Sequence, residues 1–231
     1  MPCFLAGISA CHAFAAANGV PVFEFSHQDG HVAAALYSSG ARDKLSGREH
    51  FALHISGGTT ELLLSSPSDE NAFSLRLIGE TADLNAGQVI DRVGVMLGLN
   101  FPCGAELERL ATEYDGRIEK MRVSVKEDGE LIVCNLSGVE NMAKKLYETT
   151  GDKNAVAAFV FDHIARTLDT ICQNAVEKYG EMPFVFSGGV MSNKLMRKML
   201  SEKYEAYFAE GSFSADNAAG IALLCRDRFI K

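Results

Sequence analysis

The chain has 231 residues, of which 47% are hydrophobic and 23% are charged, and this balance excludes a disordered chain and allows one or two domains with a core. The formal net charge of -8 argues against strong binding of nucleic acid by the chain alone, because neutralising phosphates needs clustered Lys and Arg. No apolar run reaches the ~20 residues that cross a bilayer, and the first residues lack the basic start of a secretory signal, so we expect a cytoplasmic protein without membrane contacts.

The first part of the chain is predicted to alternate strands with helices. Residues 2–9 have the apolar content of a buried strand, and residues 11–19 that of a short helix ending at a glycine. Residues 20–25 are predicted as a second strand and residues 31–39 as a second helix. Residues 40–48 are a polar linker.

The rest of the chain has clearer patterns. Two apolar runs flank Gly57 and Gly58 within residues 51–66, which predicts a β-hairpin. Apolar residues recur at helical spacing in residues 85–99 and 155–178. A strand is predicted at residues 183–186, a glycine turn at 187–190, and helices at 193–203 and from 217 onward. This succession predicts an α/β fold with partly parallel sheets, in which glycine turns after strands bind ligands.

Two segments have the spacing HxxxH, His27/His31 and His50/His54. On a helix, residues four apart lie on one face about 6 Å from each other and can bind one metal ion. On a strand the same spacing spans about 13 Å. His50 and His54 fall in the predicted hairpin, so we expect strand residues there. His27 and His31 are candidate metal ligands, and the alternative is that Ser26 caps the helix and both histidines are merely exposed.

A catalytic metal site with two histidines needs a third ligand, commonly a carboxylate. Asp216 stands where the last helix is predicted to begin, and its alternative role is that of an N-cap. Gln28 occupies the position where a zinc peptidase carries its general-base glutamate, so peptide hydrolysis is poorly supported. His163 lies on the apolar side of a predicted helix and is expected in the core.

Two glycine turns follow apolar strands and favour a nucleotide cleft. In ISGGTTE, residues 55–61, the glycines allow close approach of a ligand, and Ser56, Thr59 and Thr60 offer hydroxyls. In FSGGVMSN, residues 186–193, Asn193 can bond a base or ribose. Asp91 is a candidate acceptor for ribose hydroxyls, and its alternative role is that of a solvated carboxylate. Gly104 is a further candidate, and its alternative role is an ordinary turn.

The motifs of this chain are, in order, HxxxH, SGGT, GETxD, an aspartate on the next helix, PxG, SGGVxxN and DNAAGIA. Taken together in this order, they resemble those of the TsaD family. These tRNA threonylcarbamoyladenosine biosynthesis proteins were formerly called O-sialoglycoprotein endopeptidases or glycoproteases. The resemblance implies an actin-like, heat-shock-chaperone-like ATPase fold, the ASKHA class with ribonuclease H-like lobes. It implies that residues 1–47 are a remnant of an incomplete first lobe carrying HxxxH, residues 48–213 the second lobe with the binding turns, and residues 214–231 a helix returning to the first lobe. Because the family begins with a strand hairpin that precedes this chain's first motif, we expect a truncated or divergent paralogue.

By this resemblance, the protein transfers a threonylcarbamoyl group from threonylcarbamoyl-adenylate to an adenosine of tRNA, without a side-chain nucleophile. One divalent metal, iron or zinc, is expected on His27, His31 and Asp216. The substrate or an adenine nucleotide is expected to contact Ile55, Ser56, Gly57, Gly58, Thr59, Asp91, Gly104 and Asn193. The expected partners are a TsaB-like homologue, a TsaE-like ATPase, the adenylate-forming enzyme and tRNA.

Three positions depart from the family pattern. Thr59 replaces the histidine that follows SGG, Leu84 replaces a second aspartate after GET, and Glu140 replaces a lysine. Because an acidic side chain disfavours an anionic substrate, a non-catalytic nucleotide- or metal-binding scaffold subunit is a second hypothesis. A metallopeptidase, suggested only by the family's former name, is the third.

Overall fold

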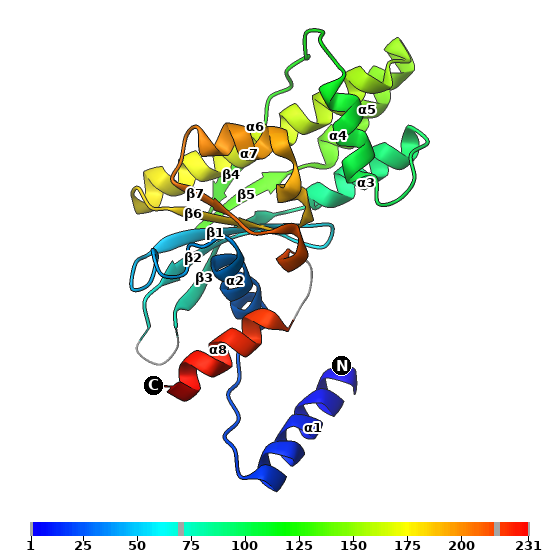
Figure 1. Ribbon diagram of the computed structural model, residues 1–231. Helices are drawn as coiled ribbons and strands as arrows, with labels where there is room; N and C mark the ends of the chain where they lie inside the picture. Colours follow the sequence, from blue (N-terminus) through cyan, green and yellow to red (C-terminus); the bar gives the residue numbers. More distant parts are fainter. Residues whose placement is uncertain (1, 69–71, 215–217, 231) are drawn as a thin grey trace.

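A seven-stranded sheet forms the centre of the protein (Figure 1). A computed structural model describes residues 2–68, 72–214 and 218–230. The strands are β1 (His50–Ile55), β2 (Thr60–Ser66), β3 (Ser74–Thr81), β4 (Ser124–Asp128), β5 (Leu131–Asn135), β6 (Phe184–Ser187) and β7 (Ala206–Phe208). Their order across the sheet is β4-β5-β3-β2-β1-β6-β7.

The sheet is mixed, as predicted. Strand β2 pairs antiparallel with both β1 and β3, and β4 pairs antiparallel with β5. Strand β1 pairs parallel with β6, β6 with β7, and β3 with β5. Strand β1 therefore lies between an antiparallel and a parallel neighbour, and all of its residues are buried.

Helices cover both faces of the sheet. The α-helices are α1 (Pro2–Asn18), α2 (His27–Ser38), α3 (Ala86–Met96), α4 (Gly104–Thr112), α5 (Ser137–Thr150), α6 (Lys153–Tyr179), α7 (Lys194–Ser201) and α8 (Ala219–Ile230), and short 3-10 helices span Gly189–Ser192 and Gly211–Phe213. Helices α2 and α8 pack on one face with a small core, and α3 to α7 pack on the other with a larger core (Figure 1).

Alternation along β1 assigns its side chains to these two faces. Phe51 and Leu53 belong to the larger core under α3 to α7, whereas Ala52 belongs to the smaller core with α2 and α8. Successive strand residues point to opposite faces of a sheet. His50 and His54, which alternate in step with Ala52, therefore face α2 and α8.

The predictions of strands at residues 2–9 and 20–25 are wrong, whereas the helix predicted at residues 11–19 is confirmed as the second part of α1. Helix α1 also includes residues 2–9, and residues 20–25 have no regular secondary structure. A short apolar run has no period that separates a buried strand from a helix, and alanine favours the helix. Helix α1 lies apart from the sheet in Figure 1, with Leu5 64% and Phe14 69% exposed. Within the described ranges, neither α1 nor another helix has both the length and the apolar content of a membrane span.

The remaining predicted elements are confirmed with shifted ends. The hairpin is β1 and β2, the helices predicted at residues 85–99 and 155–178 are α3 and α6, and the C-terminal predictions correspond to β6, α7 and α8. Residues 40–48 contain neither helix nor strand. The sequence predicts no element where the structure has β3, α4, β4, β5 and α5. Leu107, Leu110 and Ala111, the buried residues of α4, do have helical spacing, and residues 131–134 are an apolar run, so these patterns were available and were missed.

Helices α2 and α8 cross at a backbone contact. A Cβ added at Gly220 of α8 would lie 1.8 Å from the carbonyl oxygen of Gly30 in α2, so only glycine fits there. The last helix is thereby held against the helix that carries HxxxH. The lobe boundaries at residues 47 and 213 stay predictions.

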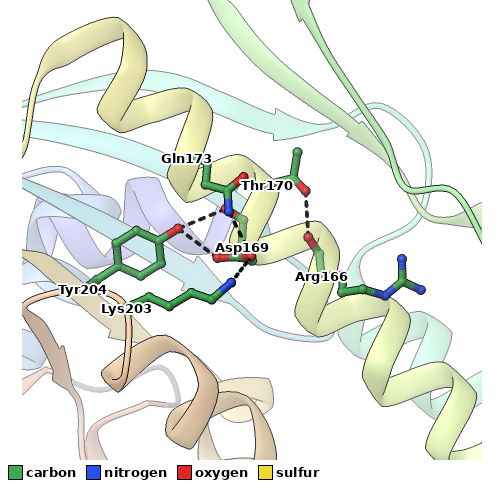
Figure 2. A network of polar contacts seen from close by, with 6 residues as sticks. All are labelled: Arg166, Asp169, Thr170, Gln173, Lys203 and Tyr204. Carbon is green, nitrogen blue, oxygen red and sulfur yellow. Dashed lines mark hydrogen bonds and ion pairs between the residues drawn. The ribbon is translucent and has the colours of Figure 1, made fainter. Parts of the chain in front are cut away.

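A buried carboxylate ties α6 to the segment between α7 and β7 (Figure 2). Asp169 is 8% exposed. It accepts hydrogen bonds from Lys203 Nζ at 2.5 Å, Tyr204 Oη at 2.9 Å and Gln173 Nε2 at 3.1 Å. Burial and the bond to Asp169 raise the pKa of Tyr204, which keeps its hydroxyl a donor. Three donors on one carboxylate compensate for its removal from water.

Replacing this acceptor should destabilise the fold. In Asp169→Ala the Tyr204 hydroxyl keeps only its longer bond to the carbonyl oxygen of residue 169, at 3.3 Å, and Lys203 and Gln173 lose the carboxylate, so we expect the free energy of unfolding to fall by about 2–3 kcal/mol. Tyr204→Phe removes one donor and leaves the carboxylate bonded to Lys203 and Gln173, so about 1 kcal/mol is expected. Urea denaturation followed by circular dichroism measures both values. Equal losses in the two variants would contradict a network centred on Asp169.

His163 lies in the core of α6, as predicted, with 1% of its surface exposed. Burial first, and then the charge of Arg166, lower its pKa to about 4. The folded protein therefore keeps this ring neutral where the unfolded chain, with an ordinary pKa near 6.5, takes up a proton.

The free energy of unfolding should consequently fall as the pH drops from about 6.5 to about 4, by up to about 3 kcal/mol from this group. His163→Leu should flatten that slope, whereas Thr167→Val on the same helix has no titrating group and should keep it. Denaturation at a series of pH values measures the slope. A slope that is unchanged in His163→Leu would show that other groups cause it.

Candidate functional site

Helix α2 begins with a cap that fixes the position of HxxxH. Ser26 Oγ accepts a hydrogen bond from the backbone nitrogen of Asp29 at 3.1 Å, and Asp29 Oδ2 accepts one from the backbone nitrogen of Ser26 at 2.8 Å. This reciprocal pair is a capping box, and it starts the helix at His27. The predicted cap is therefore present.

The two histidines of this helix also contact each other. Nε2 of His27 lies 3.0 Å from Nε2 of His31, and the ring centroids are 4.4 Å apart at an interplanar angle of 85°. Two nitrogen ligands of one tetrahedral ion are about 3.4 Å apart. The chemistry and spacing of this pair thus fit one metal ion, and capping does not exclude that role.

The third predicted ligand, Asp216, lies outside the described residues. Within the described ranges, no three His, Cys, Asp or Glu side chains are grouped closely enough to hold a metal ion. The two imidazoles account for two ligands, and a complete ligand set stays a prediction.

A third histidine joins the pair from the sheet. The ring of His54 on β1 lies 4.4 Å from that of His31, tilted by 40°, and its Nδ1 is 2.9 Å from Ser187 Oγ on β6. The expectation that His54 is a strand residue is confirmed, but its contact with α2 was not predicted. The alternation that places Ala52 under α2 was the available signal, because it places His54 there too.

These histidines line a small cavity, which we call the histidine cavity. Its volume is about 110 Å³, and Thr59 and Ser187 also line it. Gln28 Nε2 donates to Glu61 Oε2 on β2 at 2.9 Å and so joins the start of α2 to the hairpin. The space is sufficient for an ion and a few waters, at ~30 Å³ for each water.

A second cavity of about 390 Å³ lies beside the hairpin turn, and we call it the turn cavity. Four predicted binding residues line it, namely Gly57, Asp91, Gly104 and Asn193. Glu108 and Ser192 line it as well, and neither was predicted. Glu108 follows Gly104 by one helical turn, and that spacing was the signal for it.

Polar groups of the turn cavity are already oriented by the backbone. Asn193 is 5% exposed, and its Oδ1 caps α7 by accepting from the backbone nitrogen of Met196 at 2.9 Å. Its buried Nδ2 has no hydrogen-bond partner among the described residues. Asp91 Oδ1 accepts from the backbone nitrogen of Cys103 at 2.9 Å, and Glu108 Oε1 from that of Lys194 at 2.7 Å. The cavity therefore offers one amide donor and two carboxylates.

The hairpin turn separates the two cavities, since Gly57 lines the turn cavity and Thr59 the histidine cavity. Ser56 Oγ accepts from the backbone nitrogens of Gly58 at 3.2 Å and Thr59 at 3.1 Å, which makes the turn rigid. Thr60, offered above as a ligand hydroxyl, is 3% exposed and accepts from the backbone nitrogen of Ala86 at 3.1 Å. Its hydroxyl therefore anchors α3.

Two glycines let neighbouring elements approach this turn. A Cβ at Gly87 of α3 would lie 2.7 Å from the backbone nitrogen of Gly57. Gly188 has a φ of 92°, and a Cβ there would lie 2.1 Å from the carbonyl oxygen of Ile55. The side chain of Ile55 is fully buried, so only its backbone is available to a ligand.

Two of the three departures from the family pattern, Leu84 and Glu140, lie in ordered surroundings, and Leu84 does so through its neighbour Asp83. Burial alone raises the pKa of Asp83, but hydrogen bonds from the backbone nitrogens of Leu136, Ser137 and Leu84 outweigh burial and lower the pKa to about 2. Asp83 thus joins the end of β3 to the start of α5. Glu140 forms an ion pair with Arg92 of α3 at 3.2 Å.

A larger cavity of about 540 Å³ lies at the other end of β1, next to His50. None of the predicted binding residues within the described ranges lines it. Its walls come from α2, α8 and the linker after α2, so it is separate from the two cavities at the turn.

Comparison with solved structures supports the fold. Full-length HypF in its phosphate- and nucleotide-bound form has a TM-score of 0.70 and 14% identity, and the match covers 90% of this chain and 43% of that one. HypF from T. kodakarensis has a TM-score of 0.62 and 14% identity, and the match covers 95% of this chain and 39% of that one. At this identity the likeness shows the fold alone, and it agrees with the predicted ASKHA class.

Curated relatives are more similar in sequence. A tRNA N6-adenosine threonylcarbamoyltransferase of Streptococcus pneumoniae (strain CGSP14) is 32% identical over 203 aligned positions, and the match covers 85% of this chain and 57% of the relative. Its counterpart in Streptococcus suis (strain 05ZYH33) is 32% identical over 241 aligned positions, and the match covers 98% of this chain and 67% of the relative. The chain thus spans roughly three fifths to two thirds of these relatives.

The family model described as "TsaD: tRNA N6-adenosine threonylcarbamoyltransferase" matches residues 1–223. That range includes α2 with its paired histidines, the hairpin turn and the walls of both cavities. Motif order, fold and sequence similarity agree, and from them we conclude that the chain belongs to the TsaD family.

Proposed function

We propose that this chain carries a threonylcarbamoyl-transfer site, which moves the group from threonylcarbamoyl-adenylate to the exocyclic amine of an adenosine in tRNA. The observation that carries the proposal is the position of the hairpin turn. On one side of it lie two imidazoles at metal-binding distance, and on the other lies a cavity with nucleotide-binding groups. A substrate with a nucleotide at one end and an acyl group at the other fits such a pair of sites.

In this proposal the turn cavity binds the adenosine monophosphate part. Its volume of about 390 Å³ is within the usual range for small-molecule pockets. Asn193 Nδ2 donates to an acceptor on the base or ribose, and the carboxylates of Asp91 and Glu108 accept from ribose hydroxyls. At Gly57 the absence of a side chain lets the phosphate approach the backbone.

The reaction exchanges an oxygen for a nitrogen at the carbamoyl carbon. The adenosine amine forms a bond to that carbon, the bond from carbon to the phosphate oxygen breaks, and AMP leaves with the electron pair while the amine loses a proton. Attack is direct and needs no nucleophilic side chain. His27 and His31, with Asp216, would hold an iron or zinc ion, which when bound supplies a Lewis acid for the carbonyl oxygen.

Protein partners are part of the proposal. The net charge of -8 gives this chain little attraction for tRNA by itself, so partner subunits are needed to hold the RNA. A TsaB-like homologue, a TsaE-like ATPase and the adenylate-forming enzyme are the expected components, in the cytoplasm.

A second candidate is a non-catalytic scaffold that binds nucleotide and metal. It is favoured by Glu140, because this acidic side chain stands where the family pattern has a lysine and pairs with Arg92 beside Asp91. Nucleotide binding without turnover would select this candidate.

Transfer is tested with the full chain, its partner subunits, the adenylate and tRNA, and the modified nucleoside is measured by mass spectrometry. We expect modified tRNA and bound iron or zinc. His31→Ala should lose the metal and slow transfer by on the order of 100-fold or more. The exposed His12→Ala, on α1, is the control and should match the parent. Bound nucleotide without modified tRNA would contradict transfer, and chelator-sensitive cleavage of protein substrates would indicate a peptidase.

The turn cavity is tested with AMP as the probe. Asn193→Asp keeps the oxygen that caps α7 but replaces the amide donor with a charged acceptor, so the fold should be retained. We expect its affinity for AMP to fall at least tenfold, because the carboxylate faces an anionic ligand and donates nothing. Isothermal titration calorimetry measures binding, and a thermal melt checks the fold. AMP binding equal to that of the parent would place the nucleotide elsewhere.

A further inference from the structure

His54 occupies a place that its sequence context does not explain. It stands in an interior strand of the sheet, is 9% exposed, and projects toward α2 rather than into the larger core. Its neighbours on this face of the sheet include the apolar residues Ala52 on β1 and Val185 on β6. Polar residues stand directly beside it, Glu61 on β2 and Ser187 on β6. A buried imidazole among them has a desolvation cost that an aliphatic residue would avoid.

The ring of His54 is held from the sheet side. Parallel pairing sets His54 directly against Ser187 of β6, and Ser187 Oγ lies 2.9 Å from His54 Nδ1. Ser187 is 7% exposed and is the last residue of its strand. Two neighbouring strands thus fix both the place and the rotation of this imidazole.

The other side of the ring faces the paired histidines. His31 lies between two imidazoles, since its centroid is 4.4 Å from that of His27 and 4.4 Å from that of His54. The contact with His27 is edge-on at 85°, and the contact with His54 is tilted at 40°. The rotation of His31 about its Cβ–Cγ bond is therefore limited from both sides.

We propose that His54 is a positioning residue for the metal site, which holds the ring of His31 in its ligating orientation and is itself held by Ser187. The inference rests on the metal site of the proposed function. A metal-binding histidine is commonly oriented by groups that do not touch the ion, and losing one of these groups weakens metal binding by 10- to 100-fold in characterised sites.

Strand β1 supplies a matched control. His50 lies four residues before His54 on the same face of the same strand, is 3% exposed, and bonds through Nδ1 to the carbonyl oxygen of Arg48 at 3.2 Å. It borders the cavity of about 540 Å³ at the far end of α2 rather than the histidine cavity. His50→Ala therefore carries the general cost of removing a buried imidazole from β1 without affecting His31.

The experiment uses the full chain, stripped of metal and titrated with Co²⁺, whose visible absorption reports ligand number and geometry. We expect His54→Ala to bind Co²⁺ about 10- to 100-fold more weakly with an altered spectrum, while His50→Ala binds like the parent. His54→Phe keeps a ring against His31 and should recover part of the affinity. Ser187→Ala should weaken Co²⁺ binding when it is made in the parent. Added to His54→Ala, it should weaken Co²⁺ binding no further, because the two substitutions remove the same contact.

A second readout needs no metal. In the metal-free protein, the chemical shifts of the His31 ring protons should change in His54→Ala and not in His50→Ala, as measured by NMR of histidine-labelled protein. Parent-like Co²⁺ affinity, spectrum and His31 shifts in His54→Ala would overturn the inference. One set of results would overturn the positioning role of His54 and leave the metal site standing. In that set the parent and His54→Ala bind Co²⁺, whereas His31→Ala loses it. A parent that takes up no Co²⁺ overturns the proposed metal site and this inference together.

Discussion

The arrangement of the protein depends on the two-residue alternation of β1, an interior strand of the sheet. Its odd-numbered residues, such as Phe51, fill the core under α3 to α7, and its even-numbered residues face α2 and α8. Because β1 has neighbours on both sides, a register shift of one residue would move aromatic rings toward α2 and imidazoles into the larger core. The fold thus allows only one register of β1, and that register places His54 next to the HxxxH helix.

The end of β1 determines where chemistry can occur. The chain reverses at Ser56 to Thr59, and three elements meet this turn: α3 through Gly87, the end of β6 through Gly188, and the start of α2 through the bond from Gln28 to Glu61. Glycine contacts replace side chains, so the elements approach closely and leave a cavity on each side. Ligand groups held in the two cavities would be only one turn of chain apart, as a transfer reaction requires.

The parts of this fold that sequence can predict are those with a strong period or cap, such as α6, the hairpin and α2. Residues 2–9 have neither, and an apolar run of that length satisfies a strand and a helix equally. Four binding residues were predicted on one cavity because their motifs resemble those of a family. Glu108 was missed because no helix was predicted over residues 104–112, so its spacing of one turn from Gly104 was not used. Alternation along β1 places His54 on the same face as Ala52, but which helix covers that face depends on the tertiary fold, so the contact of His54 with His31 was missed.

The crossing of α2 and α8 has a consequence for how this protein can vary. Most tight helix contacts tolerate change, because a larger side chain on one helix can be matched by a smaller one on the other. At Gly220 the neighbour is the backbone carbonyl of Gly30, and no substitution can make a carbonyl smaller. A larger residue at Gly220 must therefore push α2 and α8 apart, and α2 carries His27 and His31. A change at this position would consequently reach the histidine cavity, although Gly220 does not line it.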